Sequence, residues 1–305
     1  MNGIPTMLAD IVSFKASDGL VLYGALYEPQ AKKGSALLYV SGLDGSFYGS
    51  TAEELAKASI KEGVALFSMQ HRGSYIIESF DYSTGRKELI AGSAMERFED
   101  SEKDIRGAVK FLESRGYRRI ILVGKSTGCQ KAVYYLSRNK GSNVKGLILL
   151  SPVDDRNFDL RNYRSKKTFD ARVALAKRIA RRNPNALMPP GKMSYDQRII
   201  SASRFLSTSD SSNPEGNIFD YKSAKLAEFS KVKVPVLAIF GSEDKYMVIS
   251  PIAAIRVLER DSASKFSYLV IKGAGHSLFK NNRFPSREVI RWALAALGRS
   301  PGSRR

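Results

Sequence analysis

The sequence predicts an α/β protein with a mostly parallel sheet, helices on both faces and an inserted helical segment. Short apolar runs alternate along the chain with stretches of helical periodicity, which is the pattern of repeated βα units. The apolar runs are nearly continuous, and strands covered on both faces of a sheet have this composition. One long stretch, residues 153–231, contains no strand-like run and interrupts the alternation.

The first predicted strands form an antiparallel hairpin. Residues 10–14 and 20–27 are rich in β-branched and aromatic side chains and flank a turn with the sequence S-D-G. Six further apolar runs predict strands that right-handed crossovers join, at residues 36–40, 64–69, 119–123, 144–150, 235–240 and 266–271. Amphipathic or buried helices are predicted at residues 51–60, 99–115, 127–138 and 286–297.

Residues 153–231 are interpreted as an inserted helical cap. Helical pieces are predicted near residues 169–182, 193–206 and 221–229, with proline-, glycine- and serine-rich loops between them. We therefore expect a core of residues 1–152 and 232–298, a cap of residues 153–231 and a disordered tail at 299–305. Between residues 153 and 225, fifteen Lys and Arg stand against eight Asp and Glu, and this balance of +7 favours an acidic substrate.

Composition and charge narrow the class of protein. With 43% hydrophobic residues and no apolar run near eighteen residues, we expect a soluble globular protein without a membrane span. The first ten residues lack the pattern of a secretory signal, so we expect a cytoplasmic protein. The net charge of +19 favours acidic partners, but the basic residues are dispersed and no nucleic-acid-binding motif accompanies them. The single cysteine, Cys129, is expected to be a small buried side chain.

The sequence G-K-S-T-G at residues 124–128 predicts a nucleophile. A G-x-S-x-G string arises by chance, but this one follows an apolar run and precedes a helical pattern. In such a strand-to-helix turn the serine hydroxyl projects above the sheet, and the flanking glycines let the two backbones approach closely. Ser126 is therefore the predicted nucleophile.

An activated serine needs a general base and an acid that orients it. The chain has two histidines, and His276 follows the last predicted strand, where a loop carries it over the carboxyl edge of the sheet. For His71 we expect a structural or substrate-facing role. Asp244 follows the strand before it and lies between Ser126 and His276 in the chain, with Glu243 as the adjacent alternative.

Acyl transfer also needs donors for the negative oxygen of the tetrahedral intermediate. The backbone N–H of Thr127, directly after the predicted nucleophile, is the first expected donor. The second is the backbone N–H of Leu43, because the glycine-rich loop at residues 41–45 follows a predicted strand and bends toward the nucleophile. On its own, this loop is equally well explained as an ordinary strand-to-helix connection.

Together, the turn at residues 124–128, the Asp244 loop, the His276 loop and residues 42–45 resemble the α/β-hydrolase superfamily over nearly the whole chain. The sequence S-T-G-C-Q at residues 126–130 further resembles the branch that contains siderophore esterases. The resemblance implies an eight-stranded sheet, a helical cap after the sixth strand, and a serine triad that acts on esters or related acyl bonds.

The chain departs from that branch at two positions. Lys125 stands where a histidine is common, and Ser41 stands where a glycine or histidine often precedes the loop glycine. We expect Lys125 to form a structural ion pair, with electrostatic tuning of the site as the alternative. Neither departure touches the predicted triad, but both leave the substrate open.

The sequence therefore predicts a serine hydrolase of the carboxylesterase type that cleaves an ester through an acyl-enzyme on Ser126. We expect a small-molecule ester substrate, with an acidic one favoured, and no cofactor or metal. A thioester, lactone or peptide substrate for the same residues stays open, as does a ligand-binding protein on a hydrolase scaffold. The sequence assigns no substrate-binding residue and no oligomeric state.

Overall fold

The computed structural model describes residues 8–30, 34–85, 87–191, 198–281 and 283–299. Its main sheet has eight strands in the order β1-β2-β4-β3-β7-β8-β9-β10. The first two pairings, β1 with β2 and β2 with β4, are antiparallel, and all others are parallel, as the sequence predicts. The strands are β1 Asp10–Lys15, β2 Val21–Tyr27, β3 Ser35–Val40, β4 Ala65–Met69, β7 Arg119–Lys125, β8 Val144–Leu150, β9 Val236–Gly241 and β10 Phe266–Ile271.

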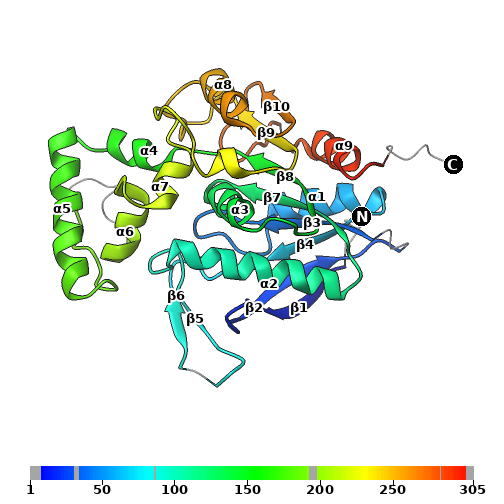
Figure 1. The fold of residues 1–305 in the computed structure, drawn as a ribbon, viewed down its shortest axis with the longest axis horizontal. Coiled ribbons are helices and arrows are strands. Elements are labelled where there is room, and N and C mark those ends of the chain that lie inside the picture. Colours follow the sequence, from blue (N-terminus) through cyan, green and yellow to red (C-terminus); the bar gives the residue numbers. More distant parts are fainter. Residues whose placement is uncertain (1–7, 31–33, 86, 192–197, 282, 300–305) are drawn as a thin grey trace, which may run out of the picture.

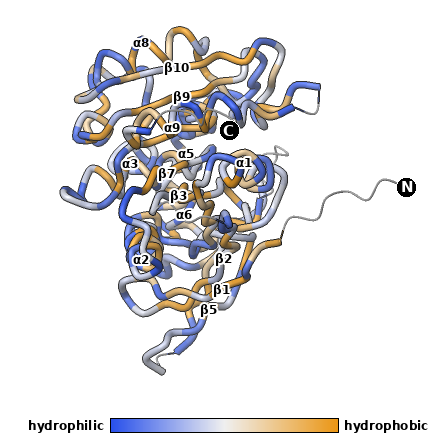
Figure 2. Tube along the Cα trace, turned by 90° about the vertical axis from the view of Figure 1, so that its right-hand side faces the viewer, coloured by the Kyte–Doolittle hydropathy of each residue, from blue (hydrophilic) through white to orange (hydrophobic). Residues whose placement is uncertain are grey.

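Helices cover both faces of this sheet (Figure 1). One face packs against α2 (Ser101–Ser114), α3 (Thr127–Arg138) and α8 (Pro251–Asp261), and the other packs against α1 (Ser50–Lys61) and α9 (Ser286–Ala296). Alternate residues of each central strand enter the two apolar cores, because successive side chains of a strand point to opposite faces. Hydrophobic residues accordingly follow the strands through the middle of the molecule (Figure 2).

The chain between β8 and β9 consists of helices joined by loops, contains no strand in its described residues, and lies at one end of the molecule (Figure 1). It carries a small apolar core of its own, formed by Ala176, Met188, Ala202 and Phe205. The division of the chain into a core and a cap stays a prediction. The elements of this segment are α4 Asp155–Arg161, α5 Lys166–Arg182, α6 Ala202–Ser209, α7 Pro214–Ile218 and the 3₁₀ turn η3 Phe229–Lys231.

Several predicted boundaries in this segment are wrong. The helix expected at 193–206 begins only at Ala202, because the Ser201 side chain accepts a hydrogen bond from the Arg204 N–H and caps the helix there. Part of that prediction, residues 192–197, lies outside the described residues. The stretch expected to be helical at 221–229 is instead a turn followed by η3, and α7 occupies part of a predicted loop.

Two elements of the core were not predicted. Helix α8 crosses between β9 and β10, and a two-stranded hairpin of β5 (Glu78–Phe80) and β6 (Leu89–Ala91) projects from the main sheet (Figure 1). Of the predicted disordered tail, only Arg299 is described, and its guanidinium donates a hydrogen bond to the Glu62 carbonyl at 2.9 Å. Residues 300–305 lie outside the described residues.

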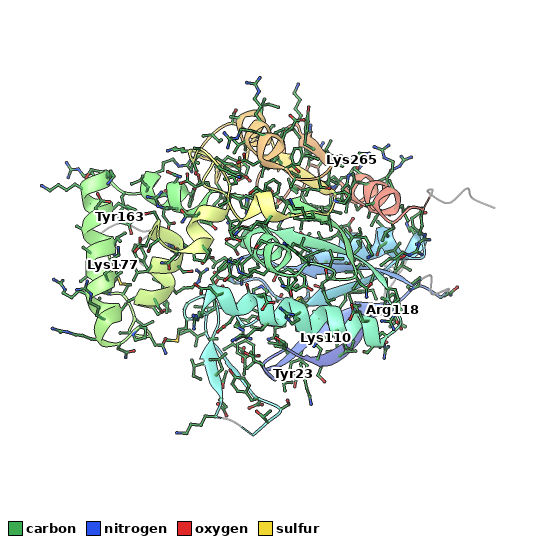
Figure 3. The ribbon with its side chains drawn as sticks, in the orientation of Figure 1. Tyr23, Lys110, Arg118, Tyr163, Lys177 and Lys265 are labelled. Atoms are coloured by element: carbon green, nitrogen blue, oxygen red, sulfur yellow. The ribbon has the colours of Figure 1, made fainter. Side chains whose placement is uncertain are left out.

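Basic side chains are distributed over the surface. Lys177 lies at the end of the molecule formed by α5, whereas Lys110, Arg118 and Lys265 lie over separate parts of the sheet and its helices (Figure 3). This arrangement agrees with the dispersed basic residues of the sequence. Within the described part of the chain, every helix is too short or too polar to span a lipid bilayer.

Candidate active site

The G-K-S-T-G sequence forms a tight turn between β7 and α3. Ser126 has a φ of 52° and a ψ of −126° and occupies the position before the first residue of the helix. A positive φ at a serine costs about 1–3 kcal/mol and persists only where the surrounding structure enforces it. The turn is thus the strained strand-to-helix corner expected of a nucleophile elbow.

The two glycines of the turn are required by close backbone contacts. A Cβ atom at Gly124 would lie 2.5 Å from the Gly128 carbonyl oxygen, and one at Gly128 would lie 2.3 Å from the Val40 carbonyl oxygen. Real Cβ atoms essentially never approach other atoms so closely. Strand β7, helix α3 and the end of β3 therefore pack together only when glycine occupies both positions.

Ser126, His276 and Asp244 are joined by two hydrogen bonds. The His276 Nε2 atom lies 2.9 Å from the Ser126 Oγ atom, and the His276 Nδ1 atom lies 2.8 Å from the Asp244 Oδ2 atom. The Asp244 carboxylate can only accept, so the Nδ1–H donates to it and Nε2 is left to accept the Ser126 hydroxyl proton. The Asp244 side chain is fully buried, whereas 21% of the His276 side chain is exposed.

Neighbouring groups hold Asp244 and His276 in position. The second oxygen of Asp244 accepts a hydrogen bond from the Tyr246 N–H at 2.9 Å, and the Tyr246 ring lies 4.5 Å from the His276 ring. The Ser151 hydroxyl donates to the His276 carbonyl at 2.9 Å. Glu243, the alternative acid, is exposed. The acid that contacts His276 is Asp244.

His71 lies elsewhere, completely buried behind the loop that begins at Ser41. Its Nε2–H donates to the Ser41 carbonyl at 3.2 Å, and its Nδ1 accepts from the Gly73 N–H at 3.1 Å. Burial lowers the pKa of His71 to about 3, with the nearby Lys131 ammonium as a second cause. His71 is thus held neutral by the fold, in agreement with a structural role.

His71 belongs to a buried charge cluster that consists of His71, Glu96, Lys131, Arg204 and Glu215. The Lys131 ammonium lies 3.0 Å from His71 Nδ1 and donates to both Glu96 oxygens, at 2.9 and 2.7 Å. Arg204, on α6, donates to both oxygens of Glu215 on α7 and lies 3.5 Å from Glu96. The buried charge cluster therefore ties the segment between β8 and β9 to the sheet.

The glycine-rich loop at residues 42–45 lies against the predicted nucleophile. A Cβ atom at Gly42 would lie 2.8 Å from the Ser126 Cβ atom. The Gly45 N–H closes a turn onto the Gly42 carbonyl at 3.0 Å, and the Asp44 carboxylate accepts a hydrogen bond from the Ser93 hydroxyl. Thr127 is the first residue of α3, where backbone N–H groups have no partner within the helix. Leu43 and Thr127 thus border the space in front of Ser126.

For two residues near Ser126, the structure tests the role expected from the sequence. Cys129 is completely buried and its thiol donates to the Gly124 carbonyl at 3.2 Å, which agrees with the expected structural role. The predicted ion pair of Lys125 is wrong. Its ammonium donates to the Ser277 carbonyl at 3.1 Å, and among the described residues no carboxylate lies within 4.0 Å of it.

A cavity of about 1000 Å³ lies beside Ser126 and His276. Its walls come from the segment after β3, the turn at Ser126, the insertion between β8 and β9, and single residues of other loops, namely Ile76, Ser93, Tyr246 and His276. The insertion supplies polar residues that the sequence did not single out, namely Asp155, Asp159, Asn162, Arg198, Arg204 and Thr208. Only the position of Asp155, shortly after the strand β8, could have indicated from the sequence that it lines the site.

Burial changes the acidity of the two acids in this wall. The pKa of Asp155 is raised well above its ordinary value by burial and by the nearby Glu215 carboxylate. Burial likewise raises the pKa of Asp159 to about 6, against the opposing charge of Arg198. Within residues 8–30, 34–85, 87–191, 198–281 and 283–299, no group of three His, Cys, Asp or Glu side chains is placed to hold a metal ion.

The order of the eight strands and the helices on both faces of the sheet form the α/β-hydrolase fold, and solved structures agree. The chain is similar to siderophore hydrolase EstB from Aspergillus fumigatus, with a TM-score of 0.69 and 19% identity over 97% of this chain and 99% of that one. It is also similar to DcsB, solved with a substrate analogue, with a TM-score of 0.67 and 15% identity over 95% and 98% of the two chains. For Est1E from Butyrivibrio proteoclasticus with bound ferulic acid, the TM-score is 0.63 and the identity 14%, over 94% and 99%.

The chain belongs to the family described as "Protein of unknown function (DUF1749)", whose model matches residues 12–296. No curated protein matches the chain. The structural relatives share the fold at low identity, and they do not by themselves assign a reaction.

Proposed function

We propose that the protein is a serine hydrolase that cleaves a small-molecule ester. The observation that carries this proposal is the pair of hydrogen bonds from His276 to Ser126 and Asp244, at 2.9 and 2.8 Å. A nucleophile, a base and an orienting acid in hydrogen-bond contact are the arrangement that activates a serine. They lie beside a cavity large enough for a small-molecule substrate.

In the proposed mechanism, His276 Nε2 takes the hydroxyl proton as Ser126 Oγ attacks the ester carbonyl. Asp244 orients the imidazole and stabilises its positive charge. The backbone N–H groups of Leu43 and Thr127 stabilise the negative oxygen of the tetrahedral intermediate. His276 then gives its proton to the leaving alcohol, and the acyl-enzyme forms. A water molecule, activated by His276, attacks the acyl-enzyme and releases the acid.

The relatives favour an ester over the other acyl bonds that the same residues cleave. EstB is a siderophore hydrolase, and the structure of Est1E contains bound ferulic acid. Esterases from Exiguobacterium antarcticum and Bacillus subtilis are further structural matches. Thioesters, lactones and peptides are therefore second candidates, and membership of the siderophore-esterase branch is part of the proposal.

Labelling with a fluorophosphonate probe tests the nucleophile. The wild-type protein should become labelled, and Ser126→Ala should not, because the probe reacts with an activated serine. Ser277→Ala is the matched control, since Ser277 is an exposed serine next to His276. Turnover of p-nitrophenyl butyrate should fall by at least about 10⁴-fold in Ser126→Ala and persist in the control.

A ligand-binding protein on a hydrolase scaffold gives the opposite result. In that case the wild-type protein stays unlabelled and hydrolyses none of the esters. Labelling that persists in Ser126→Ala would instead place the reactive group at another residue.

A further inference from the structure

Lys125 directly precedes the proposed nucleophile and lines the same cavity, yet the proposed mechanism does not use it. An ammonium group has three donors, and the one hydrogen bond that Lys125 makes among the described residues goes to the Ser277 carbonyl at 3.1 Å. The side chain is partly buried. A charge removed from water without an opposite charge costs free energy, and such arrangements concentrate at functional sites.

The other cations in the described cavity lining are occupied by carboxylates of the protein. Arg204 donates to Glu215, and the Arg198 guanidinium lies 3.8 Å from Asp159. The charge of Lys125 is therefore the positive charge in this lining that faces no carboxylate within 4.0 Å.

The net positive charge of residues 153–225 is not present in the part of this segment that lines the cavity. In the described lining, this segment contributes the acids Asp155 and Asp159 together with the cations Arg198 and Arg204. Many of its basic residues lie on α5, including Lys177, at the far end of the molecule (Figure 3). An anionic substrate is thus not explained by the net charge of the insertion and needs a local cation.

We propose that Lys125 binds an anionic group of the substrate, a carboxylate carried within a few bonds of the scissile carbonyl. This inference rests on the proposed function. Lys125 and Ser126 are consecutive and line one cavity, so a group held by the ammonium lies close to the reacting carbonyl. The two remaining N–H donors form charge-assisted hydrogen bonds to the carboxylate, and limited access of water strengthens them.

The hydrogen bond to Ser277 gives the ammonium a fixed position. Ser277 follows His276, so the same carbonyl that holds Lys125 belongs to the loop that carries the proposed base. The ammonium is therefore kept on the side of the cavity where the ester bond is cleaved. A flexible surface lysine would not select the distance between the carboxylate and the ester.

A series of matched esters tests this inference. The substrates are the monoethyl esters of malonic, succinic, glutaric and adipic acids, each paired with the neutral ester in which a carboxamide replaces the carboxylate. We expect wild-type kcat/KM to favour the anionic member at one chain length. Lys125→Met should lower the anionic-to-neutral ratio at that length by about tenfold or more, the loss of one charge-assisted interaction.

Two control variants distinguish the effect of a charge at this site from the effect of the net charge of the protein. Lys125→Arg keeps a cation and should keep most of the ratio. Lys245→Met removes the same charge from an exposed side chain beside Asp244 and should leave the ratio unchanged. Equal ratios in wild type and Lys125→Met would overturn the inference, while turnover of the neutral esters would still support the proposed function.

Binding provides a readout that does not depend on catalysis. In the Ser126→Ala background, calorimetry should give a lower Kd for the preferred anionic ester than for its carboxamide, and adding Lys125→Met should remove that difference. If no ester is hydrolysed and the fluorophosphonate probe is silent, the proposed function fails. A Kd that is the same for both esters would then overturn the inference separately.

Discussion

The two histidines of the chain each lie near a lysine, but their surroundings differ completely. In the buried charge cluster, His71 and Lys131 have no exposed surface, and Lys131 donates to both oxygens of Glu96. At the candidate active site, 21% of the His276 side chain is exposed, and Lys125 donates only to a backbone carbonyl.

The difference shows how one fold encloses and pairs such groups at one place and leaves similar groups partly exposed at another. In the buried charge cluster, each lysine or arginine faces a carboxylate, and the completely buried His71 and Lys131 are not available to a ligand. At the candidate active site, the histidine acceptor faces a hydroxyl and the lysine retains unused donors. Pairing and exposure, more than residue type, separate the structural groups from the functional ones.

Replacing the two histidines gives the largest expected contrast. His276→Ala should lower kcat/KM for p-nitrophenyl butyrate by at least about 10⁴-fold, because the base is removed. His71→Asn should lower the free energy of unfolding by about 1–3 kcal/mol, because the Gly73 N–H or the Ser41 carbonyl loses its buried partner. Steady-state kinetics and urea unfolding of both variants measure these effects. Similar kinetic losses in the two variants would show that the comparison is wrong.

Replacing the two lysines gives the next largest contrast. Lys131→Met should lower the free energy of unfolding by about 3–5 kcal/mol, because it leaves the buried Glu96 carboxylate without its partner. The double variant with Glu96→Gln should recover part of that loss. Lys125→Met makes the same change where the ammonium faces no carboxylate, and it should not destabilise the protein. Urea unfolding of the three variants checks this, and a large loss in Lys125→Met would assign Lys125 a structural role.

The buried, neutral His71 should make the folded protein less stable on acidification. The pKa of His71 is lowered to about 3 in the folded protein, against 6.5 for an ordinary histidine. Between these values the unfolded chain binds one more proton at His71, so the contribution of His71 to stability falls as the pH drops below 6.5, at about 1.4 kcal/mol per pH unit. From pH 7 to pH 5 we expect a loss of about 2 kcal/mol from this group.

Urea unfolding at both pH values measures that loss. The stability of the wild type minus that of His71→Asn should fall by about 2 kcal/mol from pH 7 to pH 5. The difference is needed because Asp159, whose pKa burial raises to about 6, gains a proton in the folded protein over the same range and opposes the loss. Glu96, whose pKa is lowered to about 2 by Lys131 and Arg204 against the effect of burial, changes the stability only below its ordinary pKa of 4.5. A difference that stays constant from pH 7 to pH 5 would contradict a neutral, enclosed His71.

The smallest expected effect is a loss of anion preference at alkaline pH. Burial lowers the pKa of Lys125 to about 8, although the Asp244 carboxylate opposes that shift. The anionic-to-neutral ratio should therefore fall by up to about tenfold from pH 7 to pH 9, as the ammonium loses its proton.

The groups that face Lys125 do not produce this change. Burial raises the pKa of the Cys129 thiol, so it adds no charge in this range, and His276 and Asp244 act on both esters of a pair. Lys125→Arg should keep its ratio at pH 9, because guanidinium stays protonated. A wild-type ratio that is constant over this range would contradict anion binding by Lys125.

The sheet and the candidate triad were predictable because their signals are local. Residues at the ends of parallel strands meet at one edge of the sheet, so the strand pattern placed Ser126, Asp244 and His276 together without any knowledge of side-chain contacts. The missed helix α8 also has a local signal, since Ser250 caps it and proline occupies its first position.

The insertion was predicted less well for a physical reason. Helices of five to seven residues, such as α7 and α4, are too short to show a clear periodicity. The charges of Asp155 and Arg204 were visible in the sequence, but their partners are set by packing between segments that are distant in the chain. The same holds for Lys125, whose charge suggested an ion pair that the loop geometry does not supply.

The spacing of the candidate triad along the chain has a consequence for biosynthesis. Ser126 and His276 are separated by 150 positions, and His276 follows β10, the edge strand that pairs only with β9. A nascent chain that has completed β7 already contains the proposed nucleophile but has neither its proposed acid nor its proposed base. If the proposed function is right, Ser126 becomes reactive only after the last strand has docked, and labelling of Ser126 would report on completed folding of the sheet.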